Sequence, residues 1–456
     1  MKLSLRVTIL SLCLLVVASS AFAQSARPLT LEECVALALR ENSTLRNAER
    51  RKQIAGTNVM TARSALFPRT DVSLSSGKFQ QGDRTLLGDV PTGVDPNTGQ
   101  VTYERRTITQ PGYSSNSNSA SVNVNQLLFD FGATWSRIKQ ANATEDASTK
   151  TYESAKQSTI LLVNQRYLGY LKELQLLKVF EEAAKTSEEQ LKRTESMFEI
   201  GSVAQGDVFR ARTTNGNDRI GLITQQNQVK NARGLLNVAM GRPTDVELDV
   251  VDIAEVPAIR EYQLDEVVQV AIEKNPELQS YRFDMKRASY GKHVARTAFL
   301  PSFSVRAAYQ RSHNEFDRVY SDFSKNWFGS IGLGMSLNLF NGFADQADLE
   351  RESLNYNIAE EEHINRLRTL RLEAEQALLS LQAWKEVTAI NSENLLSAQE
   401  DLRLAQERYR VGAGTLLDII TAQGNLTRAR SIFIRAKYDS MIAYAYLHSV
   451  MGTLGQ

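Results

Sequence analysis

The most regular pattern in the chain is a heptad repeat of apolar and small side chains. From Leu367 to Tyr409, such side chains recur at alternating spacings of three and four residues. This spacing places them on one stripe of a helix and predicts a long helix over 343–410 with left-handed supercoiling. A second long helix is expected over 133–199, where one position in seven stays apolar from Val163 to Phe198.

Apolar residues also lie outside the main stripe of the 343–410 helix. They are Leu372, Leu379, Ile390 and Leu404. A two-stranded rod has no use for them, so this helix is expected to contact more than one neighbour. A helix of 67 residues is about 100 Å long, and two helices of about 35 residues stacked end to end match it. The chain therefore offers two long and two composite helical columns.

Four shorter segments alternate between apolar and polar residues, as strands do. They are 69–78, 118–128, 302–311 and 327–339. In the last of these, Ile331, Leu333 and Met335 share one face, and small or polar residues occupy the other. Strands of this length and pattern are typical of an outer-membrane barrel, with lipid on one side and water on the other. The alternative is an amphipathic sheet packed on the protein's own core.

Four strands cannot close a barrel. An open sheet edge in lipid leaves backbone groups unpaired at several kcal/mol each, so the barrel has to be shared between chains. Two chains would give eight strands and a barrel filled by side chains, whereas three chains give twelve strands and leave a channel. The sequence therefore predicts a homotrimer in contact with outer-membrane lipid.

The order of these elements occurs twice. Leu31 and Glu32 recur as Leu264 and Asp265, and Gly201 recurs as Gly412. The remaining helices are expected over 30–64, 205–239, 264–298 and 415–450. About 22 extra residues between Gly77 and Ala120 are interpreted as a longer loop. We expect a first repeat over 24–241, an equatorial connector over 242–263 and a second repeat over 264–456.

The first residues have the pattern of a secretory signal. Lys2 and Arg6 precede an apolar run, and Ala21-Phe22-Ala23 matches the small-x-small pattern of a cleavage site. We expect residues 1–23 to be a signal peptide that is cleaved after Ala23. Cys34 is then the one remaining thiol, so no internal disulfide is expected and its predicted role is that of a small apolar helix residue.

Composition and motifs give little support for catalysis. Lys and Arg total 53 against 52 Asp and Glu, so no global field attracts nucleic acid. The four histidines have no metal-ligand spacing, and the chain contains neither a GxSxG motif nor a P-loop. We therefore expect no enzymatic activity, cofactor, metal site or nucleic-acid partner.

Two duplicated motifs point to a family. They are Gln126-Leu127-Leu128-Phe129-Asp130-Phe131-Gly132 with its partner Leu337-Asn338-Leu339-Phe340-Asn341-Gly342, and the run Tyr409…Gly412…Asp418…Ala422-Gln423. With the element order, they make the mature chain resemble the TolC-like outer membrane efflux proteins, or outer membrane factors. The resemblance implies a mainly α protein with a β-barrel portion: a trimeric 12-stranded barrel in the outer membrane of a Gram-negative bacterium, on a long periplasmic α-helical barrel.

The resemblance also implies partners and a transport role. A periplasmic adaptor (membrane fusion) protein and an inner-membrane pump of RND or ABC type would complete a tripartite complex. The expected function is passive export of small molecules or proteins. Multidrug efflux, metal efflux and type I secretion of proteins remain open. A periplasmic or surface coiled-coil scaffold or adhesin without channel activity is the alternative, although such a stalk has no need of four alternating strands.

The helix turns at Gly201 and Gly412 are the expected periplasmic entrance. Thr415 and Asp418 have capping-box spacing, which is the simplest role for this aspartate. In the resembling proteins, aspartates one turn apart can line the entrance as a gate.

In this chain Asp418 matches the first of these aspartates, Thr421 occupies the second position, and Asp207 is the counterpart of Asp418 in the first repeat. Tyr409 or Arg410 is a candidate to hydrogen-bond Asp207 and hold the entrance closed. Whether Asp418 gates or only caps its helix stays open.

Overall fold

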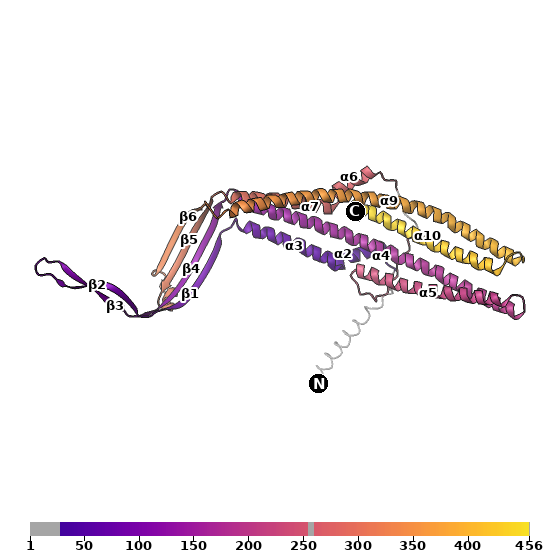
Figure 1. Cartoon of the computed structure of the whole chain (residues 1–456), viewed down its shortest axis with the longest axis horizontal. Helices are drawn as coiled ribbons and strands as arrows, with labels where there is room; N and C mark the ends of the chain where they lie inside the picture. The colour runs from indigo at the N-terminus through magenta and orange to yellow at the C-terminus, as the bar shows by residue number, and fades with distance from the viewer. Residues whose placement is uncertain (1–27, 254–259, 456) are drawn as a thin grey trace, which may run out of the picture. The chain divides into compact units, whose positions relative to one another are not determined.

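Apart from one short helix, the described helices of the computed structural model occur in pairs of equal length (Figure 1). The pairs are α2 Leu31–Glu41 with α6 Leu264–Lys274, α3 Ser43–Ser64 with α7 Pro276–Thr297, α4 Ala133–Glu199 with α9 Ala344–Arg410, and α5 Gln205–Ala239 with α10 Leu416–Val450. Their lengths are 11, 22, 67 and 35 residues. The predicted mainly helical, duplicated architecture with a β portion is confirmed.

The structure describes residues 28–253 and 260–455. The predicted signal peptide and its cleavage site after Ala23 lie outside the described residues, and so does part of the predicted 242–263 connector. Within the described ranges, none of the helices has an apolar stretch of the length and hydropathy needed to cross a bilayer.

The sequence predicted single helices over 30–64 and 264–298, and this was wrong. Asn42 and Asn275 adopt extended backbone and end α2 and α6. The Asn42 side chain accepts hydrogen bonds from the N–H groups of Thr44 and Leu45 at 2.9 and 3.2 Å, so it caps the next helix.

The same asparagines connect helices that are distant in sequence. The Asn42 amide donates to the Ala239 carbonyl at 3.0 Å, and the Asn275 amide donates to the Val450 carbonyl at 3.1 Å. These carbonyls belong to the last residues of α5 and α10. The start of α3 is thus joined to the end of α5, and the start of α7 to the end of α10.

The first of two structural units consists of helices and contains both hydrophobic cores. It comprises the described residues up to Ala55, Ala143–Met285 and those from Ile358 onward. One core gathers α2, α4 and α5 around the fully buried Tyr167 and Leu236, and Cys34 is buried there as predicted. The other gathers α6, α9 and the end of α10 around Leu370 and Leu447.

The predicted heptad stripe of α9 is its buried face within this unit. Leu370, Ala374, Ala377 and Leu381 are fully buried, whereas the apolar side chains outside the stripe stay exposed. Leu372, Leu379 and Ile390 each expose half or more of their surface. The single chain therefore leaves a second apolar face of α9 uncovered.

The second unit, Gly56–Asn142 and Lys286–Asn357, contains a four-stranded antiparallel sheet. Its strands are β1 Arg69–Gln81, β4 Tyr113–Phe129, β5 Ser302–His313 and β6 Trp327–Ser336, in the order β1-β4-β5-β6. The two copies meet where β4 pairs with β5. Strand β6 ends three residues before the predicted boundary at Leu339. In the single chain, β1 and β6 are edge strands.

The predicted long loop of the first copy is instead a second hairpin, so that prediction was wrong. It consists of β2 Arg84–Val94 and β3 Val101–Gln110, which form a separate two-stranded sheet. A short helix, α8 Phe316–Tyr320, connects β5 to β6. Both faces of the hairpin are exposed, so its sequence lacks the one-sided alternation that identifies a strand.

Candidate functional site at the helix turns and the sheet

The two turns between long and short helices have the same backbone geometry. After α9, Gly412 has φ +75°, and the Ala413 N–H donates to the Arg408 carbonyl at 2.8 Å. After α4, Gly201 has φ +76°, and the Ser202 N–H donates to the Met197 carbonyl at 2.8 Å. Both are Schellman motifs, in which glycine supplies the left-handed residue. Glycine is therefore the favoured residue at both helix ends.

The capping box predicted for α10 is present. The Asp418 N–H donates to the Thr415 hydroxyl at 3.2 Å, and the Thr415 N–H donates to the Asp418 carboxylate at 2.8 Å. The bond from the Thr415 N–H lowers the pKa of the exposed Asp418 carboxyl below its usual value. This carboxylate is therefore ionised at neutral pH.

The first copy lacks this cap. Ala204 occupies the N-cap position of α5 and has no side chain to accept a hydrogen bond. Asp207 lies where Asp418 lies in α10, and it pairs with Arg210 at 3.4 Å. The two turns thus have the same backbone conformation, but the helix that follows is capped by a side chain only in the second copy.

The Ala204→Thr variant is expected to create the missing cap and stabilise the start of α5 by about 0.5–1 kcal/mol. The reverse variant, Thr415→Ala, is expected to cost α10 about 1 kcal/mol. Hydrogen exchange of the first turns of α5 and α10 measures both changes. Slower exchange in α5 and faster exchange in α10 are the expected results, and unchanged exchange in both would contradict the capping assignment.

Acid should weaken the α10 cap in a defined direction. Since the folded-state pKa of Asp418 is lowered, its stabilising contribution is complete above the unfolded-state pKa, about 3.9, and is lost as the pH falls through the folded value. The protection of the α10 first-turn amides, which is their exchange rate relative to the intrinsic rate at the same pH, should therefore fall below about pH 4 in the wild type and much less in Asp418→Asn.

The predicted hydrogen bond to Asp207 from Tyr409 or Arg410 is not made in the described part of the chain. The Tyr409 hydroxyl donates to the Met197 sulfur at 3.7 Å, and Arg410 pairs with Glu407 at 2.7 Å. Tyr409 therefore connects the last turns of α9 and α4. Thr421 is exposed, and its hydroxyl donates to the Leu417 carbonyl of its own helix at 2.8 Å.

A groove of about 200 Å³ lies in the first unit between residues of α4 and α5 and residues of α9 and α10. Its lining includes Asp218, whose pKa is raised by burial, although a hydrogen bond from the Ser187 hydroxyl opposes the shift. This carboxylate was not among the predicted site residues. Its counterpart in the second copy is Ala429, so the duplication gave no signal.

The four-stranded sheet has one apolar face that stays uncovered in the described chain except at its far end, where α8 packs on β4 and β5 over the buried Arg311. Rows of apolar side chains cross the strands, for example Val124, Ala307 and Ile331, or Val305 and Leu333. Ile331 is 81% exposed and Leu333 is 72% exposed. The opposite face bears hydroxyls and amides, and two Ser–Ser pairs connect β1 to β4 at 2.7 Å.

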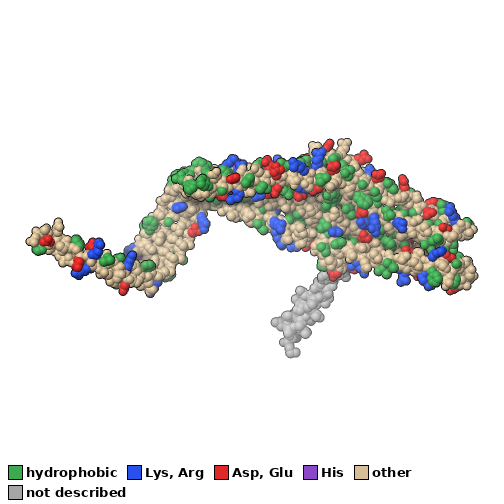
Figure 2. Space-filling model, viewed as in Figure 1, with side chains coloured by type: hydrophobic (Ala, Val, Ile, Leu, Met, Phe, Trp, Pro, Cys, Tyr) green, Lys and Arg blue, Asp and Glu red, His purple; other side chains and the backbone are tan. Residues whose placement is uncertain are grey.

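Exposed aromatic residues bound this apolar face at both ends. Where the strands meet the helices, they are Phe67, Phe129, Phe131, Phe299, Phe340 and Phe343. At the far end of β5 and β6, Tyr309 stacks on Trp327 with ring centroids 6.1 Å apart. Apolar side chains gather visibly over the strand-to-helix junction in Figure 2. Aromatic girdles above and below an apolar band are typical of strands that span an outer membrane.

The duplicated motif at this junction forms the turn from strand to helix. In the first copy, Phe131 and Gly132 have φ +54° and +88°. Asp130 then accepts hydrogen bonds from the Thr134 N–H and hydroxyl at 2.8 and 2.6 Å, which caps α4. In the second copy, Gly342 and Phe343 have φ +69° and +68°.

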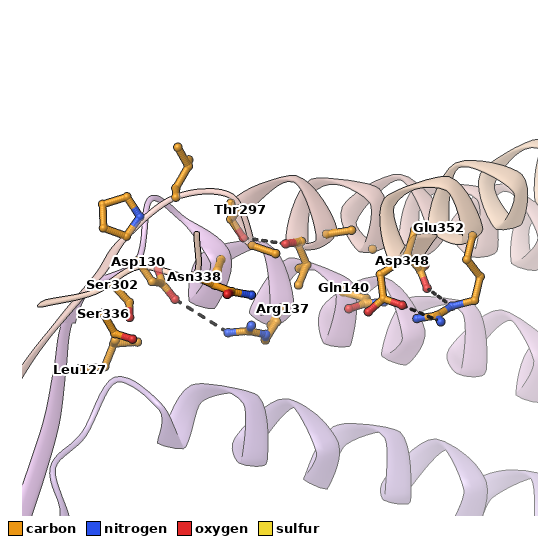
Figure 3. A pocket seen from close by; sticks show the side chains of 18 residues that line it. Leu127, Asp130, Arg137, Gln140, Thr297, Ser302, Ser336, Asn338, Asp348 and Glu352 are labelled. Atoms are coloured by element: carbon orange, nitrogen blue, oxygen red, sulfur yellow. Dashed lines mark hydrogen bonds and ion pairs between the residues drawn. The ribbon is translucent and has the colours of Figure 1, made fainter. Parts of the chain in front are cut away.

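A polar cavity of about 610 Å³ lies at the same junction within the second unit (Figure 3). Its charged side chains pair with one another: Arg137 lies 3.8 Å from Asp130, and Arg351 lies 2.8 Å from Asp348. The described residues contain no group of three or more His, Cys, Asp or Glu side chains that could hold a metal ion. The lining also includes Glu352, 3.8 Å from Arg351, so three carboxylates face two guanidinium groups in this cavity.

Comparison with known proteins gives a consistent result. The family model described as outer membrane efflux protein matches residues 34–242 and 267–453. The chain is 26% identical over 341 residues to the antibiotic efflux pump outer membrane protein ArpC of Pseudomonas putida, covering 73% of this chain and 69% of the relative. It is 22% identical over 433 residues to the outer membrane protein TolC of Escherichia coli, covering 92% and 86%.

The fold is also that of a solved channel. The structure superimposes on the Campylobacter jejuni CmeC outer membrane channel with a TM-score of 0.77, covering 93% of this chain and 85% of that one at 20% identity. Both kinds of comparison extend over the helices and the strands together.

Proposed function

The chain belongs to the outer membrane efflux protein family, and we propose that three copies of it form one channel through the outer membrane that continues into the periplasm. The channel is the outer-membrane component of an export complex. Its proposed role is that of a passive conduit, with no catalytic chemistry of its own.

The observation that carries this proposal is the sheet with an uncovered apolar face and two free edges. An apolar band between aromatic girdles is the surface that outer-membrane strands present to lipid, so contact with lipid would cover this face without exposing it to water. The edge strands β1 and β6 cannot remain unpaired there, because each unpaired backbone group in lipid costs several kcal/mol. Pairing of β1 in one copy with β6 in the next closes a barrel of twelve strands after three copies.

The helices support the same assembly. Several large apolar side chains on α5 and α9 are exposed in the single chain. They include Ile220, Ile223, Leu372, Leu379 and Ile390. Neighbouring copies would cover them and give a closed ring of helices around a wet interior. We assign 24–241 and 264–456 as the two repeats and 242–263 as the equatorial connector. The Tyr167 hydroxyl, which donates to the Leu29 and Val251 carbonyls, holds part of that connector on α4.

The turns at Gly201 and Gly412 are the proposed periplasmic entrance. Threefold assembly would bring three copies each of Asp418, Asp207, Tyr409 and Thr421 to this end. Ionised Asp418 carboxylates would favour cations there, and the Tyr409–Met197 contact would help to hold the helix ends together. The proposed partners are a periplasmic adaptor protein and an inner-membrane pump of RND or ABC type. Because one relative is named for antibiotic efflux, small molecules are the favoured substrates, with protein secretion as the alternative.

Single-channel recording in planar bilayers tests the function. The purified protein is expected to conduct and to be blocked by multivalent cations from the entrance side. Asp418→Asn keeps a capping oxygen and removes the charge, whereas Thr415→Ala weakens the cap and keeps the charge.

If Asp418 contributes to the entrance, Asp418→Asn should relieve the block by about tenfold, and Thr415→Ala should leave it nearly unchanged. Relief of block by neither variant would leave Asp418 as a helix cap. Absence of conductance in the wild type would favour a coiled-coil scaffold and overturn the proposal.

A further inference from the structure

The β2–β3 hairpin is a part of the second unit that the proposed channel does not use. Within the described residues its strands pair only with each other, in a ladder from Arg84–Gln110 to Val94–Val101. An isolated two-stranded hairpin is marginally stable in water. This one also exposes apolar side chains on both faces, namely Leu86, Leu87, Val94, Val101, Tyr103 and Ile108. The hairpin therefore requires a partner surface.

The hairpin leaves the sheet at the end remote from the helices. Strand β1 begins just after α3 and ends at Gln81, which pairs with Tyr113 of β4. Two residues, Gly82 and Asp83, separate β1 from β2, and two more, Pro111 and Gly112, separate β3 from β4. In the proposed channel, the hairpin thus lies at the outer mouth of the barrel.

The joint between sheet and hairpin, formed by residues 82–83 and 111–112, is closely packed. The Asp83 carboxylate accepts a hydrogen bond from the Gly112 N–H at 2.6 Å. A Cβ on Gly112 would lie 2.5 Å from the Gln81 carbonyl oxygen, so only glycine fits there. A Cβ on Gly82 would meet open space. The joint therefore fixes the direction in which the hairpin leaves the sheet.

The hairpin carries charges of both signs, and two ion pairs lie within it. Arg105 pairs with Asp89 at 3.2 Å, and Arg106 pairs with Glu104 at 2.6 Å. Such a surface has no field of one sign to attract anionic lipid head groups, and identical copies of it do not repel one another. An identical hairpin fits this combination of exposed apolar side chains and balanced charge.

We propose that the three β2–β3 hairpins of the assembled channel pack against one another at its outer mouth and narrow it. The inference rests on the proposed threefold assembly. Strand β2 follows two residues after β1, the edge strand that would meet the neighbouring copy, so the hairpin begins near the proposed subunit boundary. Mutual packing would bury Leu87 and Tyr103, which are 74% and 63% exposed in the single chain.

Removing the hairpin tests the proposal. Replacing residues 82–112 with Asn-Gly joins the opposed pair Gln81 and Tyr113 by a two-residue turn that suits antiparallel strands. The shortened protein is expected to remain trimeric and to show a single-channel conductance about twofold or more above that of the wild type, since a constriction is removed. Gly112→Ala should give a smaller increase, and Gly82→Ala should conduct like the wild type.

Cysteine cross-linking in outer membranes tests the packing itself. Leu86 and Leu87 are adjacent in β2 and point to opposite faces of the hairpin, so Leu86→Cys and Leu87→Cys sample the two faces separately. Cys34 will not interfere, because it is fully buried and burial raises its pKa to about 11. Because Leu87 lies on the face that mutual packing would bury, a cross-linked dimer is expected from Leu87→Cys under oxidation and little or none from Leu86→Cys.

The outcomes separate this inference from the channel itself. A wild type that neither trimerises nor conducts would overturn the proposed function. A wild type that does both, with unchanged conductance after removal of the hairpin, would overturn the hairpin inference alone. The same conclusion would follow if Leu87→Cys gave no more cross-linked dimer than Leu86→Cys.

Discussion

Arginine in place of Ile331 is expected to prevent stable assembly of the channel in the outer membrane. Ile331 lies opposite Ala307 on the apolar face of the sheet, between the two groups of aromatic residues. A charged side chain on the lipid face near the bilayer midplane costs about 2–4 kcal/mol, and the proposed threefold assembly would repeat that cost in each copy. The amount of heat-modifiable trimer in outer-membrane fractions measures the effect, and a nearly complete loss is expected.

Ser330 offers a matched control. It is the preceding residue of the same strand, is also exposed, and its side chain points to the polar face. Ser330→Arg is expected to assemble like the wild type, because its side chain would project into the wet interior. If both variants lost the trimer equally, the assignment of the lipid-facing side of the sheet would be wrong.

Alanine in place of Gly452 is expected to destabilise the helical unit by about 2–5 kcal/mol, the sum of a left-handed backbone penalty and a packing clash. Gly452 has φ +73°, and a Cβ there would lie 2.7 Å from the Lys274 carbonyl oxygen at the end of α6. Gly241 repeats the arrangement, with φ +78° and a Cβ position 2.7 Å from the Glu41 carbonyl oxygen. Chemical denaturation of the detergent-solubilised protein, followed by circular dichroism, measures the loss.

The chain contains glycines that serve as internal references. Gly216 and Gly424 lie within α5 and α10, and a Cβ on either would meet open space. Gly216→Ala and Gly424→Ala should therefore be neutral or stabilise the protein by up to about 1 kcal/mol. A Gly452→Ala variant as stable as Gly424→Ala would show that the close approach to α6 is not required.

The long helices could be predicted because their signals are local. Heptad spacing and the glycines that follow the helices gave 133–199 and 205–239, the bounds that the structure has for α4 and α5. The breaks at Asn42 and Asn275 could not be found in this way. Each break is stabilised by a hydrogen bond to the last carbonyl of another helix, such as that of Ala239. The sequence around the asparagine does not indicate such a distant partner.

In the candidate site, too, the local contact was predicted and the long-range contact was not. The Thr415–Asp418 box joins residues three apart, so its spacing alone predicted it. The partner of Tyr409 is Met197 on another long helix, and sequence spacing cannot rank that contact against the expected one with Asp207. The β2–β3 hairpin was missed because its apolar residues lie on both faces, whereas prediction of a strand depends on a difference between faces.

The end-to-end joins at Asn42 and Asn275 have a mechanical consequence. Helices α4 and α9 are uninterrupted ladders of backbone hydrogen bonds, whereas α5–α3 and α10–α7 are each coupled through a side-chain amide and close packing. When the helices are twisted, α4 and α9 should resist bending along their whole length, whereas the joined pairs should bend at Asn42 and Asn275. Rotation at the entrance would then be absorbed at two joints rather than transmitted along four rigid rods.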